Sequence, residues 1–183
     1  MTLTFVPTKI EGVVRVQLDP IRDDRGFFAR AWCEDEFAAA GLATTWVQAN
    51  LGHNPAMGTL RGMHYQREPH PETKLVRCTR GRIQDVAVDM RADSPTFRQW
   101  VSAELTAELG EMLFIGPGCA HGYLTLEPET DLFYQTSTRY ARESATGVRY
   151  DDPAFGIDWG LPVVLVSEAD RSWPLQDVRL TRR

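Results

Sequence analysis

This sequence contains little that would let the chain cross a membrane or build a disulfide framework. No apolar run approaches the roughly 18 residues that a membrane-spanning helix needs. The three cysteines, Cys33, Cys78 and Cys119, are an odd number without metal-ligand spacing, which favours a reducing compartment. The first residues lack the basic segment and apolar run of a signal peptide. We therefore expect a cytoplasmic protein with no membrane partner.

Positive charge is also in short supply. The formal net charge is −5 at pH 7, and lysine contributes only Lys9 and Lys74 to the 20 basic residues. A protein with net negative charge binds poorly to the negatively charged phosphate backbone of DNA or RNA, so we expect no nucleic-acid partner. A small anionic ligand is compatible with this charge, because a local group of arginines can hold one.

What the sequence does contain is a succession of short strand-like runs, without a linker, a repeat or a low-complexity stretch. Its 183 residues fit one domain, 1–183, which can bury about 70% of its unfolded surface. Regularly spaced short runs favour an all-β sandwich, jelly roll or barrel. The expected strands are Gly12–Leu18, Lys74–Cys78, Arg82–Met90, Gln99–Leu105, Glu111–Ile115, Gly122–Leu126 and Thr130–Thr138.

Helical signals are few. Glu34–Ala40 is predicted to be a helix, and Gly41 follows it at a position typical of a C-cap. The tail 151–183 is rich in proline, aspartate and tryptophan, which favours irregular chain with a short helix packed on the barrel. Because a barrel of this size can hold a small ligand in its mouth, inward-facing polar residues are candidates for a site.

Two neighbouring strand-like segments could bring a base beside a cation. The segment 67–73 contains two prolines and is predicted to be a loop between the strand that holds His64 and the strand that starts at Lys74. If these strands pair as a hairpin centred on Pro69, His64 lies opposite Lys74 on the same face. A register slip of one residue would turn Lys74 to the other face.

A tyrosine can join this pair from another strand. Tyr134 shares parity with Leu132 and Thr136, so it can face the interior. Taken alone, each such residue has an ordinary structural explanation: a strand histidine forms a structural hydrogen bond, a lysine at a strand start is solvated, a tyrosine packs in the core, and Asp170 caps a helix. Only the group as a whole, within a wider pattern, indicates chemistry.

That wider pattern is a series of motifs whose order and spacing resemble the dTDP-4-dehydrorhamnose 3,5-epimerase family along nearly the whole chain. Each motif is weak alone, and the series makes the resemblance specific. The matching segments are Asp24–Phe28 (DRGFF), Gln48–Asn50 (QAN), Leu60–Gln66 (LRGMHYQ), Lys74–Arg77 (KLVR), Asp85–Arg91 (DVAVDMR), Ser94–Phe97 (SPTF), Ala120–Tyr123 (AHGY), Asp152–Pro153 (DP) and Ile157–Trp159 (IDW).

The resemblance implies a cupin-type jelly-roll barrel with a few short helices. Such a protein works as a homodimer on a nucleotide sugar, without a metal or other cofactor. It also implies four catalytic residues. His64 matches the catalytic base, and Asp170 matches the carboxylate that orients it. Lys74 matches the residue beside the developing enolate, and Tyr134 matches the general acid on the opposite face.

A set of substrate-binding residues is implied in the same way. Arg25 and Arg61 match contacts to the nucleotide or its diphosphate, and the resemblance implies that Arg25 is supplied across the dimer. Tyr140 matches a substrate-positioning tyrosine. The remaining members of this set are Gln48, Asn50 and Phe28.

These residue types suit the implied substrate, a 4-keto-6-deoxyhexose carried on a nucleoside diphosphate. The ketone at C4 makes the hydrogens on C3 and C5 removable, so a base must take a proton from one face and an acid must return one to the other. Histidine has a pKa near neutrality, a carboxylate fixes its tautomer, and a cation near O4 stabilises the enolate. We therefore expect epimerisation at C3, at C5 or at both, in deoxysugar biosynthesis.

One residue departs from the family pattern. The family has a glutamate four residues after the glycine of the DRGFF motif, near the nucleotide base, whereas this chain has Arg30. Thymine N3 donates a hydrogen bond and suits a carboxylate, but cytosine N3 accepts one and suits an arginine. A CDP- or GDP-sugar is therefore an alternative to a dTDP-sugar, with Arg30 as a further candidate binding residue. The simpler alternative is that Arg30 contacts phosphate or solvent.

Two other classes of protein are alternatives. A metal-dependent cupin usually presents a His-x-His pair, a glutamate and a later histidine. Here the early pair is His64-Tyr65-Gln66, and His121 adds too little for a three-ligand site, so we expect no metal and a structural role for His121, close to the base or elsewhere. A non-catalytic sugar-binding module would lack the base and the acid, which this chain keeps.

Overall fold

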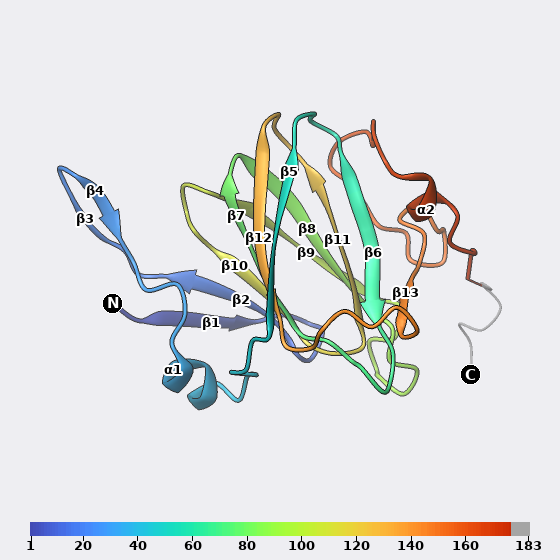
Figure 1. Ribbon diagram of the computed structural model, residues 1–183, viewed down its shortest axis with the longest axis horizontal. Helices are drawn as coiled ribbons and strands as arrows, with labels where there is room; N and C mark the ends of the chain where they lie inside the picture. The colour runs from blue at the N-terminus through green and yellow to red at the C-terminus, as the bar shows by residue number, and fades with distance from the viewer. Residues whose placement is uncertain (177–183) are drawn as a thin grey trace.

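Two antiparallel β-sheets stacked face to face form the body of the molecule (Figure 1). The structure is a computed structural model that describes residues 1–176. From edge to edge, the first sheet contains β1 (Leu3–Pro7), β2 (Val13–Leu18), β10 (Met112–Ile115), β7 (Lys74–Arg80), β12 (Thr130–Thr136) and β5 (Gln48–Asn54). The second contains β13 (Ala145–Gly147), β6 (Leu60–Gln66), β11 (Cys119–Thr125), β8 (Arg82–Asp89) and β9 (Trp100–Thr106).

Apolar side chains fill the space between the sheets and also cover their outer faces. The inner cluster includes Val76 of β7, Ile83 of β8 and Leu132 of β12, all buried. Outside the first sheet, helix α1 (Glu34–Ala39) packs Phe37 against Phe114 of β10. Residues of the C-terminal tail cover the second sheet in the same way. Since both of its faces are covered, β11 is buried along its whole length, and its residues do not alternate between buried and exposed.

The strands and the helix expected from the sequence are present, with ends that differ by a few residues. Helix α1 is followed by Gly41, whose φ of +71° is the left-handed conformation of a glycine C-cap. The expected short helix of the tail is α2 (Glu168–Arg171), while residues 177–183 of that tail lie outside the described residues. Strands β1, β5 and β13 were not anticipated, nor was a small hairpin of β3 (Ile21–Asp23) and β4 (Gly26–Phe28).

The predicted hairpin between β6 and β7 is wrong. These strands lie in different sheets, where β6 pairs with β11 and β13 while β7 pairs with β10 and β12. The loop 67–73 instead carries the chain from one sheet to the other. Its first amide, that of Arg67, donates to the Ser144 carbonyl beside the second sheet, and its last, that of Thr73, donates to the Ser137 hydroxyl beyond β12. The residue that faces His64 across a strand pair is therefore His121 of β11.

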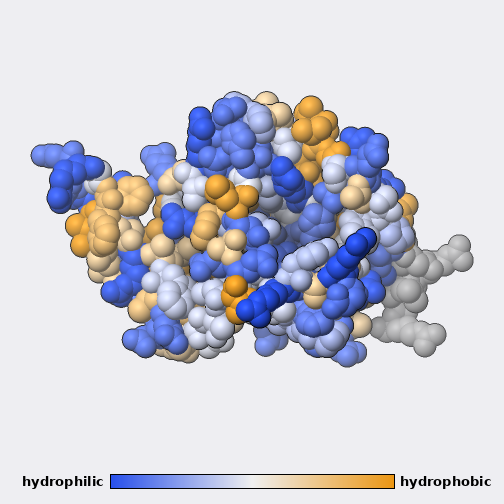
Figure 2. Space-filling model, viewed as in Figure 1, coloured by the Kyte–Doolittle hydropathy of each residue, from blue (hydrophilic) through white to orange (hydrophobic). Residues whose placement is uncertain are grey.

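The hairpin of β3 and β4 projects from the body as an arm, residues 21–28, at one end of the molecule (Figure 1). Its apolar side chains Ile21, Phe27 and Phe28 are exposed, Phe28 to 69%. Figure 2 shows hydrophobic surface gathered on this arm at the left of the view. Within residues 1–176, no helix is long and apolar enough to span a membrane.

Candidate active site

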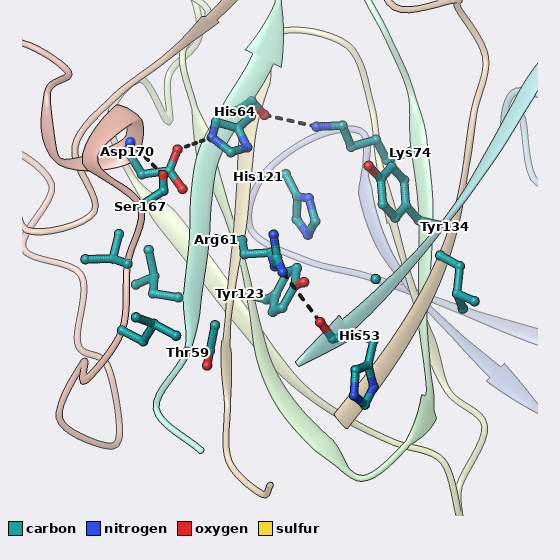
Figure 3. Close-up of a pocket in the computed structure, with 15 residues that line it drawn as sticks. His53, Thr59, Arg61, His64, Lys74, His121, Tyr123, Tyr134, Ser167 and Asp170 are labelled. Atoms are coloured by element: carbon teal, nitrogen blue, oxygen red, sulfur yellow. Dashed lines mark hydrogen bonds and ion pairs between the residues drawn. The ribbon is translucent and has the colours of Figure 1, made fainter. Parts of the chain in front are cut away.

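The four predicted catalytic side chains lie close together around the same cavities. His64 comes from β6, Lys74 from β7, Tyr134 from β12 and Asp170 from α2 (Figure 3). Two cavities, of about 680 Å³ and about 390 Å³, open on either side of this group. Among the described residues, these four are the ones that line both cavities. The group therefore forms the boundary between two adjoining spaces, each large enough for part of an extended ligand.

His64 and Asp170 form a close pair. The His64 Nε2 lies 2.6 Å from Asp170 Oδ1, and the Asp170 side chain is only 8% exposed. Burial favours the neutral carboxyl, but the hydrogen bond and charge of His64, together with the Gly62 amide, outweigh it and lower the pKa of Asp170. The carboxylate thus stays ionised and accepts a hydrogen bond from the Nε2–H group, which leaves His64 Nδ1 as the nitrogen that can accept a proton.

Local backbone geometry fixes this carboxylate. The Ser167 Oγ accepts a hydrogen bond from the Asp170 amide at 3.1 Å and caps α2, which orients Asp170 towards β6. The Gly62 amide donates to Asp170 Oδ2 at 3.3 Å. Gly62 has a φ of +143°, and a Cβ there would lie 2.5 Å from the Cα of Gly122, so only glycine allows this close approach of β6 and β11.

Lys74 reaches the same space from the opposite sheet. Its Nζ donates to the His64 carbonyl at 3.1 Å and lies 3.1 Å from Glu72 Oε1. The Lys74 side chain is 9% exposed, so these two partners replace most of the water that an ammonium group needs. Lys74 therefore contacts the His64 backbone across the space between the sheets, and not as a cross-strand neighbour in the predicted hairpin.

Tyr134 completes the group. Its neighbours of like parity, Leu132 and Thr136, are both buried, as the alternation along this strand predicts. Burial raises the pKa of the Tyr134 phenol, and the negative charge of Glu72 raises it further, while Arg61 acts in the opposite sense. Tyr134 is therefore protonated at neutral pH and able to donate a proton.

A second histidine–aspartate pair lies beside the first. His121 Nε2 is 2.7 Å from Asp85 Oδ1, and both side chains are buried. His121 also lines the larger cavity, where Figure 3 shows its ring between His64 and Tyr123. His121 can therefore hold its structural hydrogen bond to Asp85 and line the cavity at the same time.

The donors around these cavities were also compared with the grouping that a metal ion needs, among the residues that the structure describes. Within the part of the chain that the structure describes, no group of three or more histidine, cysteine, aspartate or glutamate side chains could hold a metal ion. His64 and His121 each direct one ring nitrogen to a carboxylate, which is a geometry suited to proton transfer.

Comparison with known proteins agrees with this geometry. A sequence model described as dTDP-4-dehydrorhamnose 3,5-epimerase matches residues 7–177. A protein with that name from Sinorhizobium fredii is 43% identical over 153 residues, which are 83% of this chain and 78% of the relative.

The chain belongs to the dTDP-4-dehydrorhamnose 3,5-epimerase family. A crystal structure of the dTDP-4-dehydrorhamnose 3,5-epimerase of Bacillus anthracis, with TDP and PPi bound, gives a TM-score of 0.92 at 33% identity, covering 96% of this chain and 100% of that one. A dTDP-4-dehydrorhamnose 3-epimerase from Streptomyces niveus is 34% identical over 166 residues, or 90% of this chain and 80% of the relative. The fold is accordingly the cupin-type jelly roll of this epimerase family, and the protein is an isomerase.

Four of the predicted substrate-binding residues of this epimerase line the two cavities. Arg61 lines the larger one, where its Nε donates to Asn54 Oδ1 at 2.9 Å. The smaller cavity is lined by Gln48, Asn50 and Tyr140. The Gln48 side chain joins the other two, since it donates to the Asn50 side chain at 3.1 Å and accepts from the Tyr140 amide at 3.3 Å.

The other predicted binding residues of the epimerase lie away from these cavities. Arg25 and Phe28 belong to the arm, where the Arg25 guanidinium is paired with Asp23. Arg30 follows the arm, and its Nη1 lies 2.6 Å from Glu36 Oε1 of α1. Within one chain, none of the three lines a cavity that contains His64.

Several lining residues of the epimerase site were not singled out from the sequence. Glu72 is the most closely involved, since it pairs with Lys74. A glutamate within a proline-containing loop gives no local signal of this contact. The other additional lining residues include His53, Tyr123, Ser167, Arg142 and Trp173.

Proposed function

We propose that this protein inverts C3, C5 or both in a nucleotide-linked 4-keto-6-deoxyhexose, with dTDP as the nucleotide, in deoxysugar biosynthesis. The observation that carries the proposal is the placement of His64 and Tyr134. They come from opposite sheets, they line the same two cavities, and His64 is paired with a buried carboxylate. A ring held between them would meet a base on one face and an acid on the other.

The reaction would begin with His64. Its Nδ1 takes the proton from the carbon next to the ketone, and the electron pair of that C–H bond moves into the new C–C double bond and onto O4. Asp170 stabilises the imidazolium that forms and acts as a positioning residue through its 2.6 Å contact with Nε2. No electrons are gained or lost overall, so the step needs no redox partner.

Lys74 would stabilise the enolate. Charge develops on O4, and a cation fixed beside that atom lowers the barrier, a contact typically worth about 3 kcal/mol. The Lys74 ammonium is already held in place at 3.1 Å from the His64 carbonyl. Little reorganisation would then be needed when the charge appears.

Tyr134 would complete the inversion. Its phenol donates a proton to the same carbon from the face opposite His64, the double bond returns to C4–O4, and the configuration is reversed. The raised pKa of Tyr134 supports this role, because the group must be protonated at neutral pH. Proton exchange with water then restores the imidazole and the phenol.

We further propose that the protein works as a homodimer in which the arm completes the neighbouring subunit's site. The arm projects from one end of the molecule and carries exposed apolar side chains and Arg25 (Figure 1). It lies away from the two cavities that His64 of the same chain lines. An exposed apolar surface of this kind is typical of an interface. Arg25 could then supply a planar cation for the diphosphate and Phe28 an aromatic surface for the base.

The chemistry itself calls for neither a metal nor a cofactor, since acid–base groups suffice to invert a carbon beside a ketone. The nearby arginines can bind phosphate directly. We also propose a cytoplasmic location, which fits a nucleotide-sugar substrate.

Deuterium incorporation from D₂O tests the proposed reaction. With dTDP-4-keto-6-deoxyglucose, the wild type should place deuterium at C3, C5 or both, as counted by NMR, and His64→Asn should place none. The matched control His70→Asn changes a histidine that bonds to Ser144 Oγ and lines neither cavity, so it should label like the wild type. Absence of label with the wild type, or normal labelling by His64→Asn, would refute the proposal.

A further inference from the structure

The carboxylate of Glu72 lies within the site but takes no part in the proton transfers proposed for His64 and Tyr134. It lies two residues before Lys74 and lines the smaller cavity together with His64 and Tyr134. Glu72 Oε1 is 3.1 Å from Lys74 Nζ, and the two side chains are 13% and 9% exposed. Removing such a pair from water costs free energy, so an ion pair here calls for a reason beyond stability.

The backbone around Glu72 is held on both sides. The Thr73 amide donates to Ser137 Oγ at 2.9 Å, and the Ser137 amide donates to the Thr73 carbonyl at 3.0 Å. On the other side, Thr138 Oγ1 donates to the Pro71 carbonyl at 2.7 Å. The carboxylate therefore projects from a fixed segment, which is the condition for holding a flexible lysine in one geometry.

Between its two partners, the Lys74 ammonium has a restricted orientation. An ammonium group has three donors, and one points to the His64 carbonyl while a second points to Glu72. One donor is left for a ligand. We propose that Glu72 is a positioning residue that aims this remaining Lys74 donor at O4, a role that rests on the proposed epimerase function. We further infer that its charge extends to higher pH the range in which Tyr134 keeps its proton.

The electrostatic part of this role follows from the charges around Tyr134. Burial is the largest cause that raises the pKa of Tyr134, Glu72 is the next, and Arg61 acts against them. Removing the Glu72 charge should therefore lower the pKa of Tyr134. Other titratable or charged groups also line the cavities next to this phenol. Among the described residues they are Lys74 on β7, His64 and Tyr65 on β6, His121 and Tyr123 on β11, Asp170 on α2, His53 on β5, and Tyr140 and Arg142 beyond β12.

Two substitutions separate the two parts of the role. Glu72→Gln keeps an oxygen that can accept from Lys74 but removes the charge, so the alkaline limb of the kcat profile should move to lower pH. Glu72→Ala also removes the acceptor, so kcat should fall on the order of 10- to 100-fold while KM changes little. Glu143→Gln is the matched control, because it removes a 70% exposed carboxylate beside the same loop and should leave the kinetics unchanged.

The pKa of Tyr134 can also be measured without any substrate. NMR titration of ¹³Cζ-labelled tyrosine, with the Tyr134 signal assigned from Tyr134→Phe, should show a lower pKa in Glu72→Gln than in the wild type. This result stands even if the proposed epimerase activity fails, so the two failures can be told apart. The inference is overturned if the Tyr134 titration and the alkaline limb of Glu72→Gln match the wild type. It is equally overturned if folded Glu72→Ala keeps wild-type kcat or changes KM alone.

Discussion

At the scale of single residues, the site depends on how each polar group is paired. His64 can act as a base only if its Nε2 carries the proton, and the carboxylate 2.6 Å away ensures this. The Asp170 pKa lies below its ordinary value of 3.8, so the pair persists at pH values where an isolated carboxyl begins to protonate. This hydrogen bond to the ionised carboxylate therefore contributes stability above the unfolded pKa of Asp170, and the contribution is lost as pH falls through the folded value.

Asp170→Asn tests this pairing. An amide can present either its oxygen or its NH₂ group to Nε2 and so no longer specifies the tautomer, and kcat should fall on the order of 10⁴-fold with KM little changed. The wild type should also have the higher free energy of unfolding at neutral pH, and this difference should shrink as pH falls below 3.8. Steady-state kinetics and urea unfolding at several pH values measure both effects. Wild-type kcat in Asp170→Asn would show that the carboxylate does not orient His64.

Not every residue of the site could be found from its sequence context. The parity of Tyr134 with Leu132 placed it correctly, because alternation along a strand is a local property. Glu72 was missed because its contact with Lys74 depends on the path of a loop between sheets. Arg30 shows the same limit, because its pairing with Glu36 of α1 depends on how the chain after the arm meets the helix.

At the scale of elements, local patterns predicted which segments form strands but not which strands pair. The hairpin between β6 and β7 was a reasonable default for neighbouring segments, yet both edges of each strand are occupied by strands distant in sequence. Strand β5 was missed because it lies at the edge of its sheet and alternates between partly buried and exposed residues, with Leu51 74% exposed. Pairing of distant segments is decided by the packing of the two sheets, which a single sequence does not display.

At the scale of the whole molecule, the arm is the feature that one chain alone does not explain. Arg25 and Phe28 lie on an exposed hairpin, whereas His64 lines the two cavities of the body. If the arm serves the neighbouring subunit, each complete site needs two chains. The homodimer is then part of the catalytic unit.

Mixed dimers test this arrangement. In homodimers, in which both subunits carry the same substitution, Arg25→Ala should raise KM severalfold and His64→Asn should be inactive. A purified heterodimer of the two should regain one complete site, because the subunit with intact His64 receives an intact arm from its partner. Light scattering should give about twice the chain mass of 20.7 kDa. A monomeric mass, or a heterodimer no more active than Arg25→Ala, would show that the arm does not act between subunits.

The central claim is that His64 and Tyr134 act on opposite faces of one keto sugar. The most direct measurement follows deuterium and configuration together, by NMR, for Tyr134→Phe in D₂O. The base remains in this variant, so the account predicts that C3 or C5 gains deuterium while its configuration is retained, and that epimerised product is nearly absent. Inversion at the wild-type rate by Tyr134→Phe would contradict the account, because the returning proton would then come from another group.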